Sequence, residues 1–228
     1  MEKFERLEQL VSTKAINSLK NKTVLVLGIG GVGGYTVEAL ARSNIGRLII
    51  VDNDTIEESN INRQIIALDS TIGKKKTDVM KERIKDINSN CEVIAYHEFI
   101  TKDNIDLLFK EEIDYLVDAC DTIPTKKLVI KECNKRKIKL ISSMGTAKKM
   151  DPSKLEITDI YKTINDPIAR IIRKFVKDEK IKHLTALSSR ELPKDINGLG
   201  SNAFVPATAG LLIASYIVND VVNDVKKA

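Results

Sequence analysis

The chain has 228 residues, of which 43% are apolar and 30% are charged. At about 100–200 residues per domain this length suits one large domain, and the composition is that of a folded soluble protein, which excludes a mainly disordered chain. The formal net charge of +5 permits a polyanionic partner but is too small to require one.

The three cysteines, Cys91, Cys120 and Cys133, are far apart and form no Cys-x-x-Cys pair. They therefore offer neither a disulfide framework nor a cysteine-based zinc site. The N-terminal residues also lack the apolar run of a secretory signal. Together these features predict a cytoplasmic protein.

The first 145 residues alternate short β-branched runs with helical patterns, after an amphipathic segment at residues 4–19. The predicted strands are residues 23–27, 47–51, 93–96, 115–118 and 138–142. The predicted helices are residues 34–43, 75–87, 104–109 and 125–135. This alternation predicts an α/β fold, a Rossmann-like, doubly wound and mainly parallel sheet with helices on both faces.

After Gly145 the pattern is less regular and predicts a strand at 155–160, a helix at 167–176, a polar loop at 188–200 and an apolar helix at 207–218. The apolar run is shorter than the roughly 18–20 residues of a membrane span, so we expect a buried helix or a dimer seam and no span. We interpret the chain as one domain, residues 1–228, with a Rossmann-like core at 1–145 and a C-terminal elaboration at 146–228.

A glycine-rich turn, GIGGVG at residues 28–33, joins the first strand to the next helix. Gly28 permits the tight turn, Gly30 lets backbone approach a phosphate, and Gly33 lets the helix pack close to the strand. The start of that helix attracts anions, and Asp52 at the end of the second strand is placed to bind a ribose. The turn alone does not distinguish NAD, FAD and ATP.

Two cations and a carboxylate favour ATP. Arg63, in the run SNINRQ, and Lys76 suit a triphosphate whose charge must be neutralised while a carboxylate attacks the α-phosphorus. Asp121 follows the fourth strand, at the edge where ligands bind in such sheets, and suits Mg²⁺. An NAD-dependent oxidoreductase, the interpretation that the glycine turn alone would allow, leaves all three without a role.

These motifs, together with DND at residues 52–54 and DACDT at 118–122, resemble the ThiF/E1-like superfamily of ATP-dependent adenylating enzymes. In that superfamily ATP transfers AMP to a substrate carboxylate. The resemblance implies that Asp52 binds ribose, that Arg63 and Lys76 bind phosphates, and that Asp121 binds Mg²⁺. It implies a nucleotide pocket formed by Gly28, Gly30, Gly31, Gly33, Asp52, Asp54, Asn60, Asn62, Arg63, Gln64, Lys76, Asp121 and Thr122.

Within the superfamily, residues 151–170 and 204–215 resemble one branch, the tRNA threonylcarbamoyladenosine dehydratases, which close the side chain of a modified tRNA adenosine into a ring. The resemblance implies a homodimer in which Arg6 reaches the neighbour's ATP site as a further catalytic residue. Whether the protein also uses a monovalent cation or an accessory sulfur-transfer partner protein stays open. So does the alternative function, adenylation of the C-terminus of a ubiquitin-like sulfur carrier, although enzymes of that kind typically carry two Cys-x-x-Cys pairs.

The charge is unevenly distributed along the chain. Residues 1–121 carry 16 Lys and Arg against 21 Asp and Glu, a net of −5, whereas residues 122–182 carry 17 against 7, a net of +10. The polyanionic backbone of a tRNA would bind to the basic segment, because each contact of Lys or Arg with a phosphate releases counterions and so adds to the affinity. The predicted tRNA contacts are Lys126, Lys127, Lys135, Arg136, Arg170, Arg173, Lys174 and Lys177. The last four share one face of the predicted helix.

Overall fold

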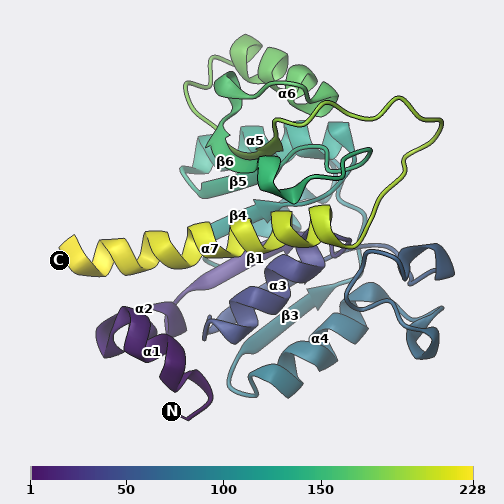
Figure 1. The fold of residues 1–228 in the computed structure, drawn as a ribbon. Coiled ribbons are helices and arrows are strands. Elements are labelled where there is room, and N and C mark those ends of the chain that lie inside the picture. Colours follow the sequence, from purple (N-terminus) through teal and green to yellow (C-terminus); the bar gives the residue numbers. More distant parts are fainter. Residues whose placement is uncertain (1, 228) are drawn as a thin grey trace.

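Residues 2–227 are described by a computed structural model (Figure 1). They form one seven-stranded sheet in the order β3-β2-β1-β4-β5-β7-β6, in which every neighbouring pair is parallel except β6–β7. The strands are β1 (Thr23–Leu27), β2 (Arg47–Val51), β3 (Glu92–Tyr96), β4 (Tyr115–Asp118), β5 (Lys139–Ser143), β6 (Leu155–Asp159) and β7 (Thr185–Ser189). The sheet confirms the predicted α/β fold.

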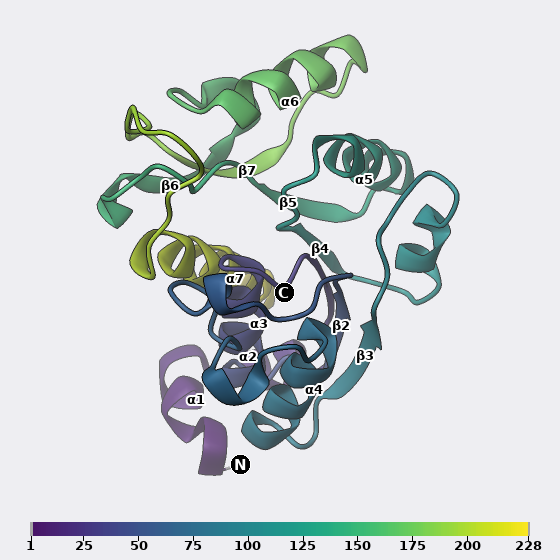
Figure 2. The ribbon, with the colours of Figure 1, turned by 90° about the vertical axis from the view of Figure 1, so that its right-hand side faces the viewer.

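Helices cover both faces of this sheet (Figure 2). The α-helices are α1 (Glu5–Val11), α2 (Thr13–Lys20), α3 (Gly33–Arg42), α4 (Lys76–Ile87), α5 (Ile123–Arg136), α6 (Pro167–Asp178) and α7 (Phe204–Lys227). The 3-10 helices are η1 (Glu2–Phe4), η2 (Glu58–Asn60), η3 (Asp69–Thr71), η4 (Ile105–Phe109), η5 (Pro152–Lys154) and η6 (Ile160–Lys162). In β1, Val24 and Val26 belong to the core shared with α3 and α7, whereas Leu25 and Leu27 belong to the core shared with η4 and α5.

The last helix, α7, crosses one face of the sheet beside α3 (Figure 1). Gly210 permits this close packing, because a Cβ atom there would lie 2.3 Å from the carbonyl oxygen of Val32. The helix is long and apolar enough to cross a membrane, but half of its most apolar window is buried within the molecule. Ile213 and Ile217 are part of the core, which confirms the predicted buried helix.

Three elements differ from the sequence-based expectation, and the first is α7, whose 24 residues are twice the 12 predicted at 207–218. The amphipathic segment 4–19 is divided into α1 and α2 by Ser12, whose φ of +92° ends one helix and whose hydroxyl accepts a hydrogen bond from the Ala15 N–H at the start of the next. The predicted polar loop at 188–200 is wrong at its start, since Ser188 and Ser189 belong to β7, which lies between β5 and β6. Both serines are buried, so these polar residues belong to a strand of the sheet and not to a solvent-exposed loop.

Candidate active site

The glycine turn lies at the carboxyl edge of the parallel strands, between β1 and α3. Gly28 has a φ of +90°, and a Cβ atom there would lie 2.8 Å from the carbonyl carbon of Ala119, at the end of β4. A Cβ atom at Gly33 would lie 1.8 Å from the Gly28 carbonyl oxygen. Both positions therefore require glycine, and the turn packs directly against the loop that follows β4.

Asp52 directly follows β2 and fixes this turn. Its carboxylate accepts hydrogen bonds from the backbone N–H of Ile29, at 2.6 Å, and from that of Asp54, at 2.8 Å. Burial raises the pKa of Asp52 above its usual range, although the nearby Lys76 ammonium opposes the shift. Each oxygen retains a further lone pair, so the arrangement is compatible with the expected contact to a ribose hydroxyl.

Lys76 is the first residue of α4, and it is almost completely buried, at 5% exposure. Its ammonium donates to the carboxylate of Asp54 at 2.7 Å, and the Asp54 side chain is itself exposed. The pair therefore joins a buried cation to a carboxylate on the solvent side of the site. The backbone supports this pairing, because the Lys76 N–H donates to the Asp54 carbonyl at 3.1 Å.

The segment around η2 brings Arg63 and Gln64 to the glycine turn. One guanidinium nitrogen of Arg63 donates to the Ser59 carbonyl and to the side-chain oxygen of Asn62, while the Arg63 carbonyl oxygen lies 3.4 Å from a Cβ position on Gly31. The other guanidinium nitrogens have no protein acceptor within residues 2–227 and are free to bind an anion.

Gln64 is buried, and its Nε2 atom lies 3.9 Å from a Cβ position on Gly30. Its Oε1 atom is buried without a hydrogen-bond partner in the described chain. An unsatisfied buried acceptor costs about 1–3 kcal/mol, so a ligand that donates a hydrogen bond at this turn would offset that cost. The side chain of Asn60, by contrast, has a partner within the protein. Its Oδ1 atom accepts a hydrogen bond from the Glu57 N–H, at the start of η2.

Asp121 lies in the loop between β4 and α5, with an exposed carboxylate whose one hydrogen bond in the described chain comes from the Thr122 hydroxyl at 3.3 Å. Residues 2–227 contain no group of three or more His, Cys, Asp and Glu side chains that could enclose a metal ion. A single carboxylate suits Mg²⁺, which keeps several waters and takes other ligands from substrate phosphates. The donor set therefore fits the metal expected from the sequence.

The three thiols are unsuited to nucleophilic attack. Burial raises the pKa of Cys91 and of Cys133 to about 12. Cys120 lies in the same loop as Asp121, and burial, followed by the adjacent Asp118 carboxylate, raises its pKa far above its usual value. All three are protonated near neutral pH, whereas a thiolate is needed for attack on an acyl-adenylate.

One predicted tRNA contact is wrong. Lys126 is 1% exposed, and its ammonium lies 3.0 Å from the buried carboxylate of Asp118, so it cannot reach a nucleic acid. The spacing of apolar residues could have revealed that Lys126 is buried. It lies three, four and seven residues before Val129, Ile130 and Cys133, which are buried on the same face of the helix. A lysine on the apolar face of a helix is a candidate for a buried ion pair.

The remaining predicted contacts on α5 do not form one surface. Lys127 lies toward α6, 5.6 Å from the Phe175 ring, whereas Arg136 pairs with Asp106 at 2.7 Å and covers the ring of Phe109 on η4. Lys135 is exposed near the end of the helix.

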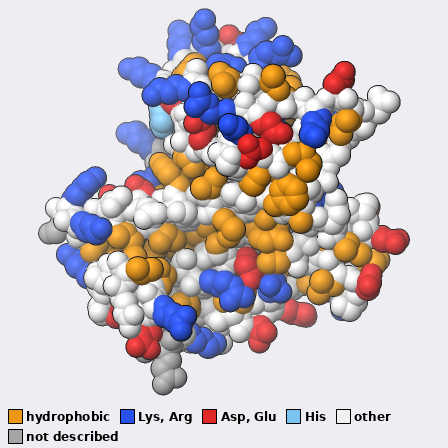
Figure 3. Space-filling model, in the orientation of Figure 1, with side chains coloured by type: hydrophobic (Ala, Val, Ile, Leu, Met, Phe, Trp, Pro, Cys, Tyr) orange, Lys and Arg blue, Asp and Glu red, His pale blue; other side chains and the backbone are white. Residues whose placement is uncertain are grey.

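Helix α6 presents a basic face at the top of the molecule in Figure 3. Arg170, Lys174 and Lys177 are exposed, and Ala169, Ile172 and Val176 are buried on the other side of the helix. Arg173 is half-buried and donates to the Thr163 carbonyl at 2.5 Å, so its guanidinium is partly committed to the protein. The other three are free to meet a polyanion.

Arg6 lies on α1, an exposed position on the far side of the molecule from the glycine turn (Figure 1). It does not reach the nucleotide site of its own chain. This placement is what a contribution to a neighbouring subunit requires, and that contribution stays a prediction.

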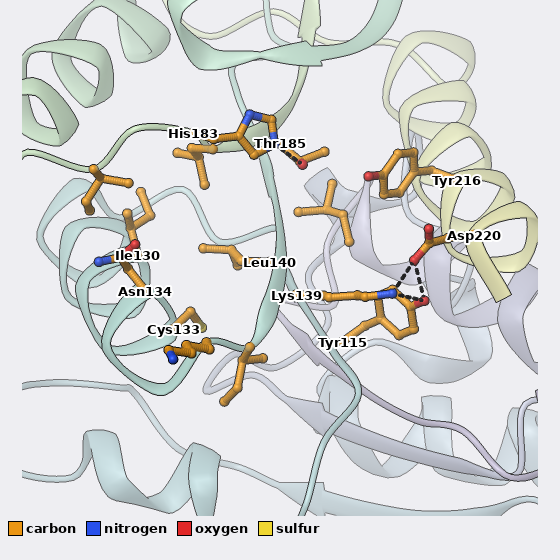
Figure 4. A pocket seen from close by; sticks show the side chains of 15 residues that line it. Tyr115, Ile130, Cys133, Asn134, Lys139, Leu140, His183, Thr185, Tyr216 and Asp220 are labelled. Carbon is orange, nitrogen blue, oxygen red and sulfur yellow. Dashed lines mark hydrogen bonds and ion pairs between the residues drawn. The ribbon is translucent and has the colours of Figure 1, made fainter. Parts of the chain in front are cut away.

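A cavity of about 430 Å³ lies at the opposite, amino edge of the sheet, between α5 and α7 (Figure 4). Leu140 and Ile130 contribute to its apolar lining, and His183, Tyr216 and Lys139 contribute polar groups. None of the residues predicted for the nucleotide or tRNA sites lines it. The motif residues instead gather in the open loops at the carboxyl edge, where α/β sheets bind their ligands.

Comparison with known proteins identifies the family of this chain. Residues 4–216 match the model of the ThiF family. The chain is 43% identical to tRNA threonylcarbamoyladenosine dehydratase of Bacillus subtilis, over 99% of this chain and 97% of the relative. It is 36% identical to the enzyme of that name from Escherichia coli, over 78% of this chain and 66% of the relative.

Solved structures give the same result. The chain superposes on the crystal structure of the E. coli dehydratase TcdA in complex with ATP with a TM-score of 0.94 and 32% identity, covering 99% of this chain and 96% of that one. The TcdA complex with AMP gives a TM-score of 0.93 at the same identity. The adenylyltransferase and sulfurtransferase MOCS3 of Culex quinquefasciatus is 36% identical over 54% of this chain and 28% of the relative. The chain therefore belongs to the ThiF family and, within it, to the tRNA threonylcarbamoyladenosine dehydratases.

Proposed function

We propose that this enzyme uses ATP to dehydrate threonylcarbamoyladenosine in tRNA, closing the modified side chain into a ring. The observation that carries the proposal is the match along 99% of the chain to a curated dehydratase. The segments that contact the glycine turn add support: one carries Arg63 and the buried Gln64, whose Oε1 atom has no partner in the described chain, and another carries the exposed Asp121. The buried Lys76 pairs with Asp54, next to the residues that hold the turn.

The reaction has two steps. The carboxylate of the threonine moiety attacks the α-phosphorus of ATP, a new O–P bond forms, and pyrophosphate leaves. The carbamoyl group of the same nucleoside then attacks the activated carbonyl carbon, and AMP leaves with one of the former carboxylate oxygens. With the proton lost from the carbamoyl group, the nucleoside has lost one water.

Charge neutralisation is the main contribution of the protein to the first step. The guanidinium nitrogens of Arg63 that have no acceptor within residues 2–227 and the buried ammonium of Lys76 would neutralise the negative charge that builds on the phosphates. Asp121 would hold Mg²⁺, which when bound neutralises further phosphate charge. Gln64 would accept a hydrogen bond from the nucleotide, and Asp52 one from its ribose.

The second step needs no enzymic nucleophile. The attacking group is part of the substrate, so its effective concentration is high and supplies rate by itself. The raised pKa values of the three thiols agree with this, because a protonated cysteine forms no thioester. Enzymes that pass an activated carrier to a cysteine would need surroundings that lower the pKa of that cysteine, so that it is a thiolate near neutral pH.

The tRNA would lie along the basic face of α6, with Lys127 beside it. This face belongs to the segment of net charge +10, and the backbone of tRNA is the polyanion that such a segment favours. An enzyme that acts on tRNA would work in the cytoplasm.

A homodimer is supported by the apolar side chains that α7 leaves on the surface. Phe204, Leu211 and Tyr216 are exposed, and hydrophobic groups form a band across this face of the molecule (Figure 3). A second copy covering the band would remove it from water.

The test is pyrophosphate release from ATP in the presence of tRNA that does or does not carry threonylcarbamoyladenosine. We expect release with the modified tRNA alone, and mass spectrometry of the product nucleoside should show the loss of one water. Release driven by a carrier protein ending in Gly-Gly, with none from the modified tRNA, would instead establish the alternative adenylyltransferase.

A further inference from the structure

A fully buried ion pair lies directly behind the loop that carries Asp121, and the mechanism above does not use it. Asp118, the last residue of β4, is 0% exposed. Its Oδ2 atom accepts from the ammonium of Lys126 at 3.0 Å and from the hydroxyl of Ser142, on β5, at 2.6 Å. Its Oδ1 atom accepts from the thiol of Cys120 at 3.0 Å.

The pair joins the two ends of one short loop. Asp118 precedes residues 119–122, and the backbone N–H of Lys126 donates to the carbonyl of Thr122, the last residue of that loop, at 3.0 Å. Lys126 therefore contacts the start of the loop through its side chain and the end through its backbone. Cys120 adds a contact from the middle of the loop to the same carboxylate.

The loop so constrained touches the glycine turn through Ala119 and carries the expected metal ligand Asp121. Ala119 packs against Gly28 so closely that no Cβ atom fits between them. Asp121 faces solvent with one weak side-chain contact of its own, to Thr122. The position of the Asp121 carboxylate is thus set by the backbone of the loop, and the backbone is set by the buried pair.

Stability alone does not account for a pair of this kind. Removing two charges from water is costly, and a buried ion pair is often no more stabilising than apolar side chains of similar volume. Its geometry, however, is specific: a carboxylate with three donors from the loop, β5 and α5 admits one arrangement of these segments around the end of β4.

We propose that Lys126 is a positioning residue for adenylation, which acts by pairing with Asp118 and thereby holding Asp121 where the metal and the phosphates of ATP must lie. The proposal rests on the proposed function. It replaces the tRNA contact expected from the sequence with a role on the buried side of the first turn of α5, inside the molecule.

The test compares Lys126→Met with Lys22→Met. Lys22 is the control at the opposite edge of the sheet, where it forms a half-buried pair with Asp114, the residue directly before the amino end of β4, at 2.7 Å. Three quantities are measured for each variant: thermal unfolding, ATP binding by calorimetry with and without Mg²⁺, and kcat and KM for pyrophosphate release.

We expect Lys126→Met to bind ATP without Mg²⁺ as the wild type does and to lose most of the increase in affinity that Mg²⁺ brings. Its kcat should fall by about 10²-fold, the cost of a misplacement of roughly 1 Å, while KM for ATP changes little. Lys22→Met should match the wild type in all binding and kinetic values. A folded Lys126→Met enzyme with a normal Mg²⁺ response and kcat would overturn the proposal.

Lys126→Met leaves the Asp118 carboxylate buried and unpaired, so a second variant combines it with Asp118→Asn to give an uncharged pair that folds. We expect this double variant to regain thermal stability without regaining the Mg²⁺ response. Recovery of both would show that the pair is structural only. The Mg²⁺ response needs no tRNA, so it reports on the positioning role even if the wild type releases no pyrophosphate with modified tRNA, the result that would refute the proposed function.

Discussion

Asp121 is the side chain on which the metal assignment depends, and its exposure makes the assignment easy to test. Its carboxylate has one hydrogen bond within the described chain, to Thr122, so Asp121→Ala removes no buried contact. We expect the melting temperature to stay within about two degrees of the wild type, as for most surface substitutions. The kcat for pyrophosphate release should fall by about 10²–10³-fold, as for other single groups that stabilise transition-state charge. Wild-type turnover in Asp121→Ala would remove the residue from the mechanism.

Glu38, on α3, makes a pH-dependent contribution to stability. Its carboxylate accepts from two nitrogens of Arg83, at 2.6 and 3.1 Å, and from Arg42 at 2.8 Å. Burial alone would raise the pKa of Glu38, but Arg83 and Arg42 together hold it below its usual value of 4.5. The stabilisation is therefore complete above about pH 4.5 and is lost as the pH falls through the lower pKa of the folded state.

Glu38→Gln should lower the free energy of unfolding by about 1–3 kcal/mol at pH 7, because it weakens charge-assisted hydrogen bonds between α3 and α4. Urea unfolding of both proteins from pH 7 to pH 3 measures the difference. It should be constant near neutrality and shrink below about pH 4.5. A difference that instead grew in acid would mean that another group controls this junction.

At the scale of elements, α6 is the helix whose surface is predicted to bind tRNA. Lys174→Glu with Lys177→Glu should weaken binding of modified tRNA and lower the slope of log affinity against log salt by about 0.7–0.9 for each phosphate interaction removed. ATP affinity should not change, since neither lysine is near the glycine turn. Lys85→Glu, an exposed lysine on α4, is the control. Equal reduction of tRNA and ATP affinity would show a structural defect.

The strands of the core were predicted to within one residue, because β-branched runs between turn residues have few alternatives. The strand Thr185–Ser189 was not predicted. It is buried because it lies between β5 and β6, and this pairing of segments distant in the chain is not visible in the local sequence. The motif residues Asp52, Arg63 and Lys76 gather at one edge of the sheet, as their spacing predicted. Lys126 was misassigned because a count of charges does not tell a solvated face from a buried one.

At the scale of the whole molecule, the exposed position of Arg6 makes its predicted action across a dimer testable by complementation. Arg6→Ala and Lys76→Ala should each be inactive alone. When the two are mixed, unfolded and refolded together, half of the dimers are mixed and each of these has one complete site, so about a quarter of wild-type activity should return. An Arg6→Ala protein that is active on its own would show that Arg6 has no role.

Charge also divides the molecule as a whole. Residues 1–121 have a net charge of −5 and residues 122–182 one of +10, so the small overall value is the sum of an acidic and a basic segment, and the exposed part of the basic segment includes one face of α6. A long polyanion approaching the enzyme would therefore be oriented by the field before it makes contact, with its backbone toward α6.

The long helix α7 makes the nucleotide site depend on a late part of the chain. Pro206 packs beside Gly31, at 3.1 Å from a Cβ position there, and Gly210 packs against the first turn of α3. On the ribosome the glycine turn is made early, but Pro206 is translated 173 residues after Gly33. At about 5–20 residues per second this interval is roughly 10–35 s. A nascent chain therefore lacks the helix that packs against the glycine turn during most of its synthesis, and we expect a product that terminates before Pro206 to release no pyrophosphate from ATP.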